Sequence, residues 1–288
     1  MLSNALTLPH RDAKPRERGL TMVIDSGMPT GYFQDAMTSA AEYVDYVKFG
    51  WGTSLVTPGL STKIDTLRTL GIDFFFGGTL FEKHIAQGRF DDYRALCRRL
   101  GCSHVEVSDG TIELASRDKS AYIRELADEF TVLSEVGYKD GDRSERLSPS
   151  RWVEFIQADL DAGASLVITE ARESGTSGIC RPDGRLRIGL IEDILTSGLP
   201  VGRLLFEAPG KTLQAHFIER VGPWANLGNI AVTDVIGLET LRLGLRSDTF
   251  GCFPDGQVGQ VGQADQVGPS DEPRAQIPDA RQSRIRAA

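Results

Sequence analysis

The sequence predicts an α/β protein, a (β/α)8 TIM barrel in a single domain, and three observations carry this prediction. Short apolar runs rich in β-forming residues recur at spacings of roughly 23 to 37 residues, which suits one strand and one helix per unit. The segments between the runs show helical periodicity, and almost every run ends in polar residues. A doubly wound open sheet is the alternative. The runs begin near Thr21, Val44, Ile72, His104, Thr131, Leu166, Arg203 and Asn229.

The segments between the runs have the apolar spacing and the end signals of helices. Ser61 is expected to cap the helix that ends at Gly71. Ser148, followed by Pro149, predicts the start of a later helix. The apolar positions of the predicted helices are Ile64, Leu67 and Leu70; Phe90, Tyr93, Leu96, Cys97 and Leu100; Val153, Ile156 and Leu160; and Leu213, Phe217 and Val221.

Composition indicates the class of protein and excludes some partners. Of the 288 residues, 40% are hydrophobic and 25% charged, which is typical of a soluble globular protein. The net charge of -8 argues against a general nucleic-acid surface and against binding to an acidic membrane. There is no signal-peptide core, no apolar run of membrane-spanning length and no CxxC pair among the cysteines. We therefore expect a cytoplasmic protein.

The chain divides into three parts by composition. Residues 18–250 carry the eight repeats and form the predicted catalytic barrel domain. Residues 1–17 are expected to be a loose N-terminal arm. Residues 251–288 repeat QVGQ-like units with almost no large apolar side chains, so they cannot bury enough surface to offset the entropy of ordering them. This composition predicts a disordered C-terminal tail.

Polar residues at the ends of the runs locate the expected active site, because chemistry in barrel enzymes gathers at the carboxyl ends of the strands. Structural ion pairs around the barrel mouth are the alternative, and the convergence of so many strands on one rim argues against it. In chain order these residues are Asp25; Lys48; Thr79 and Glu82; Glu106, Ser108 and Asp109; Glu135 and Lys139; Glu170, Arg172 and Glu173; Glu207 and Lys211; and Asp234.

The mixture of acidic and basic groups indicates a chemistry. Carboxylates on neighbouring strand ends repel one another unless a hard cation lies among them, and oxygen ligands suit Mg²⁺. We therefore expect Mg²⁺ as cofactor, with Glu135, Glu170 and Glu207 as ligands, directly or through water. The basic groups suit a small substrate with phosphate and carboxylate groups. The residues expected to bind it are Asp25, Lys48, Ser108, Arg172, Ser174 and Lys211.

Several segments resemble the phosphosulfolactate synthases of coenzyme M biosynthesis. They are RGLTMVIDSGMP, DYVKFGWGTS, GGTLFE, VEVSDG, SEVGYK, DLDAGA, ITEARESG, FEAP and GLETLRLGLRSDTFG, and they run in order from Arg18 to Gly251. The resemblance implies a (β/α)8 barrel and a Mg²⁺-dependent lyase that adds sulfite to C3 of phosphoenolpyruvate. It also implies that charge collects on an enediolate, that Lys139 protonates C2 to give (2R)-phospho-3-sulfolactate, and that the protein is a homo-oligomer such as a trimer.

Two other functions stay open at this point. A sibling barrel enzyme would add another nucleophile to phosphoenolpyruvate or a related enol phosphate. A non-catalytic barrel would act as a stress or scaffold protein, and the retained Lys139 and carboxylates argue against that reading.

Overall fold

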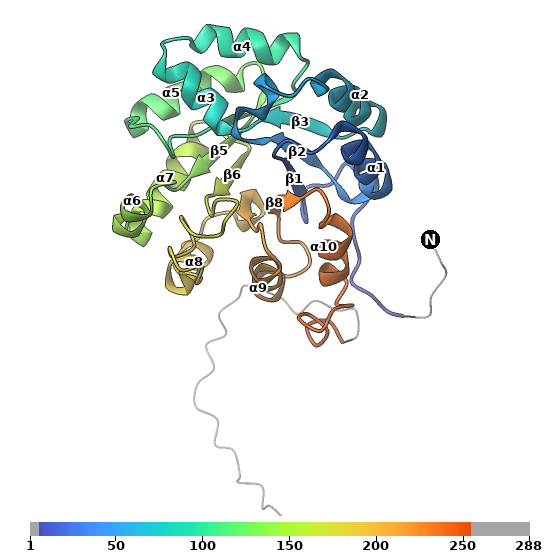
Figure 1. Cartoon of the computed structure of the whole chain (residues 1–288). Helices are drawn as coiled ribbons and strands as arrows, with labels where there is room; N and C mark the ends of the chain where they lie inside the picture. The colour runs from blue at the N-terminus through green and yellow to red at the C-terminus, as the bar shows by residue number, and fades with distance from the viewer. Residues whose placement is uncertain (1–5, 255–288) are drawn as a thin grey trace, which may run out of the picture.

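Eight parallel strands curve into a barrel with helices around its outside in the computed structural model, which describes residues 6–254 (Figure 1). The strands follow the order β3-β2-β1-β8-β7-β6-β5-β4, so chain neighbours lie side by side and β1 pairs with β8. Strands β3 and β4 are in contact at the ends of this order, and the barrel is nearly closed. The predicted TIM barrel is confirmed, and the open doubly wound sheet is not formed.

The predicted runs coincide with the strands to within two or three residues. Each strand is short and is buried on both faces, as parallel sheets covered by helices require. The strands are β1 Thr21–Asp25, β2 Tyr46–Phe49, β3 Asp73–Phe76, β4 His104–Val107, β5 Thr131–Val136, β6 Leu166–Thr169, β7 Leu204–Glu207 and β8 Leu227–Ala231.

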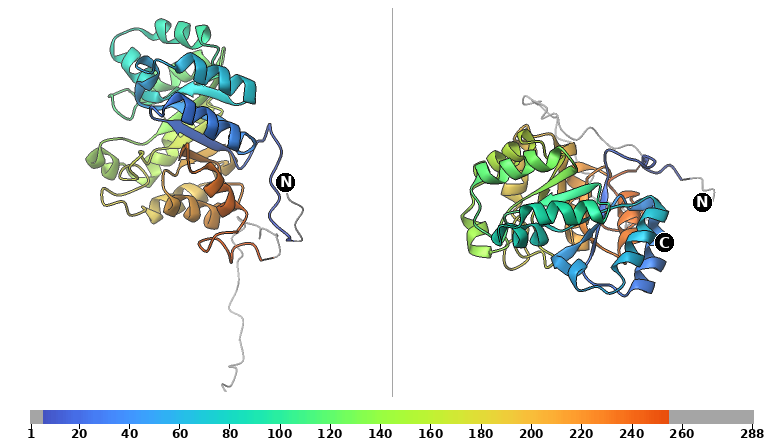
Figure 2. Two further views of the ribbon diagram at one scale, coloured as in Figure 1. Left: turned by 45° about the vertical axis from the view of Figure 1, so that its right-hand side comes forward. Right: turned by 90° about the horizontal axis from the view of Figure 1, so that it is seen from above.

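The helices lie between successive strands and cover the outer face of the barrel, as the two views in Figure 2 show. The α-helices are α1 Thr30–Ala40, α2 Leu60–Leu70, α3 Gly78–Ala86, α4 Phe90–Arg99, α5 Ser116–Ala127, α6 Gly141–Arg146, α7 Pro149–Asp161, α8 Ile188–Thr196, α9 Lys211–Val221 and α10 Val235–Arg242. Short 3₁₀ segments are η1 Ala41–Tyr43, η2 Gly50–Leu55 and η3 Val201–Arg203.

Two of the predicted helix ends are confirmed and one is wrong. Gly71 ends α2 in the left-handed conformation at φ 63°, and the Ser148 side chain accepts a hydrogen bond from the Arg151 N–H at the start of α7. Ser61, however, lies inside α2. That helix begins two residues earlier than predicted, and its N-cap is Gly59, whose carbonyl accepts the hydrogen bond that starts the helix.

The core has two parts, on either side of the barrel wall. The larger part lies between the sheet and the helices. The smaller part fills the barrel interior and contains Leu20, Met22, Phe75, Leu133, Leu166, Ile168 and Leu205. Side chains two residues apart on a strand share a face. The interior leucines and isoleucine at 133, 168 and 205 are therefore followed, one layer higher, by Glu135, Glu170 and Glu207, which stand on an apolar floor.

The described part of the N-terminal arm is not loose, which corrects the expectation for residues 6–17. Arg16 is buried and forms an ion pair with Asp45 at the amino end of β2. Lys14 donates hydrogen bonds to backbone carbonyls at the same end of the barrel, and Arg11 pairs with Glu239 of α10 at 2.8 Å. Carboxylates and carbonyls of the barrel thus bind the cations of the arm.

The domain boundaries themselves stay a prediction. Of the predicted tail, only residues 251–254 belong to the described range, and Phe253 among them is buried against the barrel. The remaining part of the predicted disordered tail, residues 255–288, lies outside the described residues. No helix within residues 6–254 is long and apolar enough to cross a membrane.

Candidate active site

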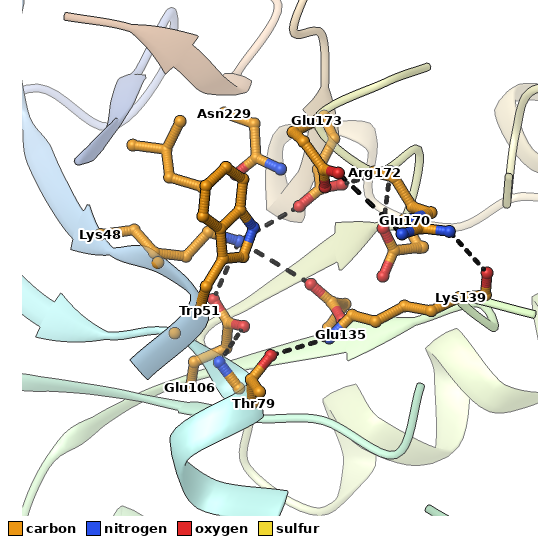
Figure 3. A pocket seen from close by; sticks show the side chains of 15 residues that line it. Lys48, Trp51, Thr79, Glu106, Glu135, Lys139, Glu170, Arg172, Glu173 and Asn229 are labelled. Atoms are coloured by element: carbon orange, nitrogen blue, oxygen red, sulfur yellow. Dashed lines mark hydrogen bonds and ion pairs between the residues drawn. The ribbon is translucent and has the colours of Figure 1, made fainter. Parts of the chain in front are cut away.

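A cavity of about 340 Å³ opens at the carboxyl ends of the strands, above the apolar floor (Figure 3). Residues from all eight βα units line it, so the mouth is built from segments far apart in the sequence. The lining residues are Ile24, Lys48, Gly50, Trp51, Gly77, Gly78, Thr79, Glu106, Glu135, Lys139, Glu170, Arg172, Glu173, Glu207 and Asn229.

Lys48 of β2 lies at the bottom of this cavity among carboxylates. Its Nζ is 3.1 Å from Glu207 Oε1, 3.3 Å from Glu106 Oε2 and 3.8 Å from Glu135 Oε2. The side chain is only 5% exposed. Burial lowers the pKa of the ammonium group, but the surrounding carboxylates outweigh burial and raise the pKa above its ordinary value. Lys48 is therefore a permanent buried cation shared among the acidic residues.

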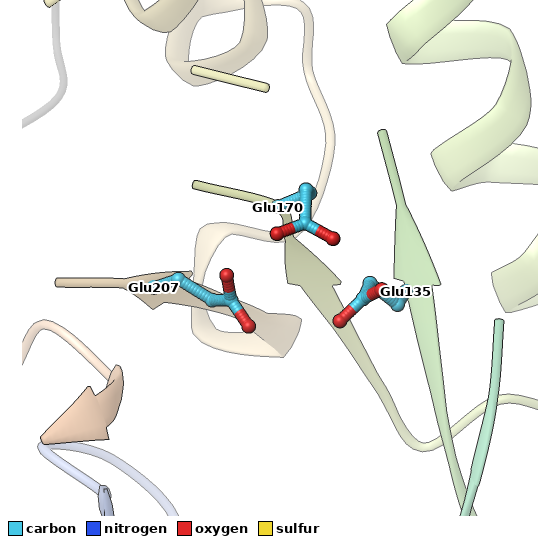
Figure 4. A group of neighbouring side chains, drawn as sticks. All are labelled: Glu135, Glu170 and Glu207. Carbon is cyan, nitrogen blue, oxygen red and sulfur yellow. The ribbon is translucent and has the colours of Figure 1, made fainter. Parts of the chain in front are cut away.

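Glu135, Glu170 and Glu207 end the neighbouring strands β5, β6 and β7 and converge (Figure 4). One carboxylate oxygen from each lies within 4.8 Å of the other two, and all three side chains are buried. Glu170 Oε2 is buried without a hydrogen-bond partner. An unpartnered carboxylate oxygen beside two others is the donor set that a hard divalent cation requires. The residues present therefore fit Mg²⁺.

The protonation states of these acids differ because their neighbours differ. Burial raises the pKa of Glu170 well above its usual range, and the charges of Glu135 and Glu207 raise it further. Burial opposes ionisation of Glu135 too, but the ammonium groups of Lys139 and Lys48 outweigh it and hold the pKa of Glu135 at about 2. Without a metal, Glu170 thus binds a proton more readily than Glu135 does.

Lys139 follows β5 and reaches into the cavity from the wall opposite Lys48. Its Nζ is 3.7 Å from Glu135 Oε1 and 3.7 Å from Glu82 Oε1, and it donates a hydrogen bond to Thr79 Oγ1 at 3.4 Å. Its side chain is 27% exposed. Burial lowers the pKa of Lys139, but the neighbouring carboxylates outweigh it and raise the pKa. Lys139 is protonated and partly open to the cavity, as a proton donor must be.

Arg172 and Glu207 are fixed together by the backbone. The N–H groups of Ala171 and Arg172 donate hydrogen bonds to Glu207 Oε2 at 2.9 and 3.1 Å, and the Arg172 N–H also reaches Glu170 Oε1. Arg172 adopts φ 61° to make these contacts. Its guanidinium group is near Glu173 and the carbonyl of Lys139, and its side chain is 42% exposed at the mouth. A partly exposed guanidinium here is suited to an anionic group of a ligand.

Four predicted substrate-binding residues do not line the cavity. Asp25 is buried against Lys63, and Ser108 donates hydrogen bonds to carboxylates from behind the cavity wall. Ser174 is exposed and hydrogen-bonded to Thr176. Lys211 begins α9 and pairs with Asp248 on the surface. Each already has a protein partner. Their assignment to substrate binding stays a prediction.

Sequence reasoning missed several lining residues. Glu106 appears among the strand ends, yet its role as a partner of Lys48 emerges only from the folded barrel. Burial raises the pKa of Glu106 to about 7, and the charge of Lys48 opposes that rise. Trp51 lies beside a predicted strand end, and its position in a glycine-rich turn was the one signal available. Asn229 carried no signal, since it falls inside a strand.

The cavity lies in a chain with clear relatives. A profile of the family described as (2R)-phospho-3-sulfolactate synthase (ComA) matches residues 9–248. The chain is 52% identical to a phosphosulfolactate synthase of Bacillus subtilis over 246 residues, which cover 85% of this chain and 98% of that protein. It is 42% identical to a phosphosulfolactate synthase of Methanothermobacter thermautotrophicus over 247 residues, covering 84% and 95%.

Comparison with solved structures supports the fold alone. The YdjI aldolase from Escherichia coli K12 superposes with a TM-score of 0.50 at 12% identity, covering 85% of this chain and 94% of that one.

Proposed function

The chain belongs to the phosphosulfolactate synthase family, and we propose that it is a lyase that joins sulfite to phosphoenolpyruvate to form (2R)-phospho-3-sulfolactate. The observation that carries the proposal is the cavity itself. It combines three convergent carboxylates with Lys139 and Arg172, in one space of suitable size for a small anion.

The charged residues of the cavity indicate where each group of the substrate would bind. Arg172, partly exposed at the mouth, binds an anionic group through its guanidinium. The carboxylates would repel a trianionic substrate unless a cation lies between them. Glu135, Glu170 and Glu207 would hold Mg²⁺ for this purpose. When bound, Mg²⁺ supplies Lewis-acid stabilisation of negative charge on the substrate carboxylate.

Lys139 supplies the proton in this reaction. Sulfur forms its bond to C3 of phosphoenolpyruvate, and the π electron pair of the C2–C3 bond moves toward the carboxylate. The Lys139 ammonium then gives one proton to C2, and the neutral amine regains a proton from solvent. Thr79 and Glu135 orient Nζ before this transfer, because each contacts it within 4 Å. Lys48 does not transfer the proton: carboxylates surround its Nζ, and its side chain is almost completely buried.

A direct assay tests the function. The protein is incubated with phosphoenolpyruvate, sulfite and Mg²⁺, and the sulfonated product is measured by mass spectrometry. We expect product with sulfite, none in EDTA, and recovery when Mg²⁺ is restored. Turnover of phosphoenolpyruvate only with a different nucleophile would favour the sibling enzyme, and full activity in EDTA would contradict the metal assignment.

Metal binding has a second readout that does not depend on activity. Because burial and neighbouring charge raise the pKa of Glu170 without a metal, Mg²⁺ competes with a proton at this carboxylate. Titration calorimetry in buffers of different ionisation enthalpy should therefore detect proton release. The Glu170→Gln variant should bind Mg²⁺ more weakly and release no proton. Equal proton release by both proteins would exclude Glu170 as the group displaced.

Two further proposals remain: the cysteine usage supports a cytoplasmic location, and the family resemblance supports a homo-oligomer such as a trimer. Sedimentation velocity of the full chain measures the second, and a monomer at micromolar concentration would contradict it.

A further inference from the structure

Three residues on the cavity wall hold an unusual backbone conformation. Within residues 6–254, the non-glycine residues with positive φ are Trp51 at 54°, Arg172 at 61° and Asn229 at 53°. All three line the same cavity. Such conformations cost free energy and persist where a site requires the resulting geometry. Arg172 uses it to place its N–H on Glu207, whereas the requirement at Asn229 has no explanation in the contacts between protein groups.

Asn229 owes its position to a bulge in β8. Strand β1 pairs Thr21 with Leu227 but Val23 with Ile230, so β8 has one more residue than β1 across this interval. A β-bulge of this kind re-aims a side chain, and bulges are common beside active sites. Asparagine tolerates the left-handed conformation better than most residues. The bulge therefore turns Asn229 toward the cavity at the cost of a regular ladder.

The neighbouring Gly228 shows that two successive residues face the barrel interior. A Cβ atom on Gly228 would lie 2.3 Å from Leu205 Cδ2 and 2.6 Å from Met22 Cε, both in the interior core. Regular alternation would then point residue 229 outward, toward the helices. Instead Asn229 lines the cavity. Because Gly228 and Asn229 both face inward, the amide of Asn229 lies on the cavity wall, where a regular strand would place no side chain of residue 229.

The carboxamide of Asn229 has no hydrogen-bond partner in the described part of the chain that would account for it. The residue is only 5% exposed, and its Oδ1 is buried and unpartnered. Buried polar groups are normally hydrogen-bonded, and leaving one unpaired costs stability. No acceptor among the described residues pairs with Asn229 Nδ2 either, so this N–H group is the part of the amide that an anionic ligand can complete.

The position of Asn229 indicates which reactant it meets. Lys139 must reach C2, and the metal carboxylates end β5, β6 and β7, so phosphoenolpyruvate lies toward those strands. Strands β8, β1 and β2 form one side of the remaining wall, and Figure 3 shows Asn229 there with Lys48 and Trp51, away from Lys139. A nucleophile that approaches C3 from this side meets Asn229.

We propose that Asn229 forms the subsite for the nucleophilic oxyanion, with its carboxamide donating a hydrogen bond to an oxygen atom of sulfite. This assignment rests on the proposed function. An amide suits the place because it is neutral: a cation there would be drawn to Glu207, as Lys48 is at 3.1 Å. The amide can hold an oxyanion without being neutralised by that carboxylate, leaving the sulfur lone pair free to attack C3.

Two variants test the subsite. Asn229→Gly keeps the left-handed backbone and removes the amide, and Asn229→Asp keeps the shape but replaces the donor by a negative oxygen. Asn229→Gly should raise the KM for sulfite by about 10- to 100-fold, the range for losing a hydrogen bond to a charged group. Asn229→Asp should raise it more. The KM for phosphoenolpyruvate should change only a few-fold in either. Thr233→Ala, an exposed change just beyond the same strand, is the matched control.

Calorimetric titration of the Mg²⁺-loaded protein with sulfite alone separates this proposal from the proposed function. Wild-type protein that binds sulfite in an Asn229-dependent way, yet yields no product with phosphoenolpyruvate, would support the subsite and contradict the function. Product formation with unchanged sulfite KM and affinity in both variants would overturn the subsite alone. A rise confined to the KM for phosphoenolpyruvate would also overturn it. Wild-type protein with neither sulfite binding nor turnover would contradict both.

Discussion

Two clusters of buried charge lie on the neighbouring strands β1 and β2, and they differ in how completely their groups are paired. At the end of β1, Lys63 Nζ contacts Asp25 Oδ2 and the carbonyl of Met28. The other oxygen of Asp25 accepts hydrogen bonds from the N–H groups of Gly27 and Met28. One cation meets one anion, neither side chain is exposed by more than 1%, and neither residue lines the cavity.

The cluster around Lys48 is unbalanced by comparison. Three carboxylates lie within 4 Å of its single ammonium group. Glu106 Oε2 and Glu170 Oε2 are buried without hydrogen bonds. A balanced ion pair serves the fold, whereas an excess of buried carboxylate is costly unless a ligand completes it. The difference teaches that unsatisfied charge, rather than buried charge as such, distinguishes the cavity proposed as the functional site.

The largest effect is expected for Lys139, whose ammonium group contacts Glu135 of the unbalanced cluster around Lys48. A general acid contributes about 10²- to 10⁴-fold, so Lys139→Ala should lower kcat by that factor and change substrate binding only a few-fold. Steady-state kinetics at saturating substrate measures this. Lys83→Ala, an exposed lysine on α3, is the control. Wild-type kcat in Lys139→Ala would show that another group donates the proton, and Lys48→Ala would be the next variant to examine.

The balanced pair should instead affect stability. Lys63→Met leaves Asp25 buried without its cation, which should lower the free energy of unfolding by about 3–5 kcal/mol. Chemical denaturation measures the loss. Adding Asp25→Leu to Lys63→Met should recover much of it, because the uncompensated charge is gone. Full stability in the single variant would mean that the pair does not hold β1 and α2 together. A large loss of kcat in the folded fraction would return Asp25 to the substrate-binding residues.

Glu106, a member of the unbalanced cluster around Lys48, should make the free energy of unfolding of the metal-free protein depend on pH. Its pKa rises from 4.5 to about 7 on folding, because burial disfavours its charge. Between these values the folded state keeps a proton that the unfolded state has lost. The free energy of unfolding contributed by Glu106 should therefore fall by a few kcal/mol as the pH rises from 4.5 to about 7. Glu106→Gln should flatten that slope, and an unchanged slope would assign it to another acid.

The smallest effect is expected for Lys211. Its side chain is 48% exposed, and it pairs with Asp248 on the surface, where ion pairs contribute little. Lys211→Ala should leave the melting temperature nearly unchanged. Its KM for phosphoenolpyruvate tests the remaining prediction that this lysine binds substrate: a rise of about 10-fold or more would confirm that role.

Much of the barrel could be predicted because its signals are local. The start of each apolar run and the glycine or serine at a helix end depend on neighbouring residues. The convergence of Lys48, Glu135, Glu170 and Glu207 also followed, since parallel strands bring their carboxyl ends to one rim. The common direction of the strands was enough for this prediction.

The remaining features of the site depend on ion-pair partners and strand register, which are set only in the folded chain. Asp25 resembles the other strand-end acids in sequence, but in the folded chain it forms an ion pair with Lys63, which is 38 residues away. Arg172 lies two residues after Glu170, a spacing that places side chains on one face of a regular strand, yet its left-handed backbone ends the alternation. Asn229 escaped notice because the bulge inserts one residue and reverses the expected direction of the side chain. Partner choice and register cannot be read from spacing alone.

The contact between Lys48 and Glu207 spans 159 positions of the chain, and the hydrogen bond from the Leu20 N–H to Asn226 spans 206. A ribosome adds about 5–20 residues per second, so roughly 10 to 30 s separate the synthesis of Lys48 from that of Glu207. During that interval β1 has no β8, and one edge of the half-made sheet stays open to other strands. The candidate active site is thus among the last parts of the molecule to form, and the β1 edge stays open until the final strand is made.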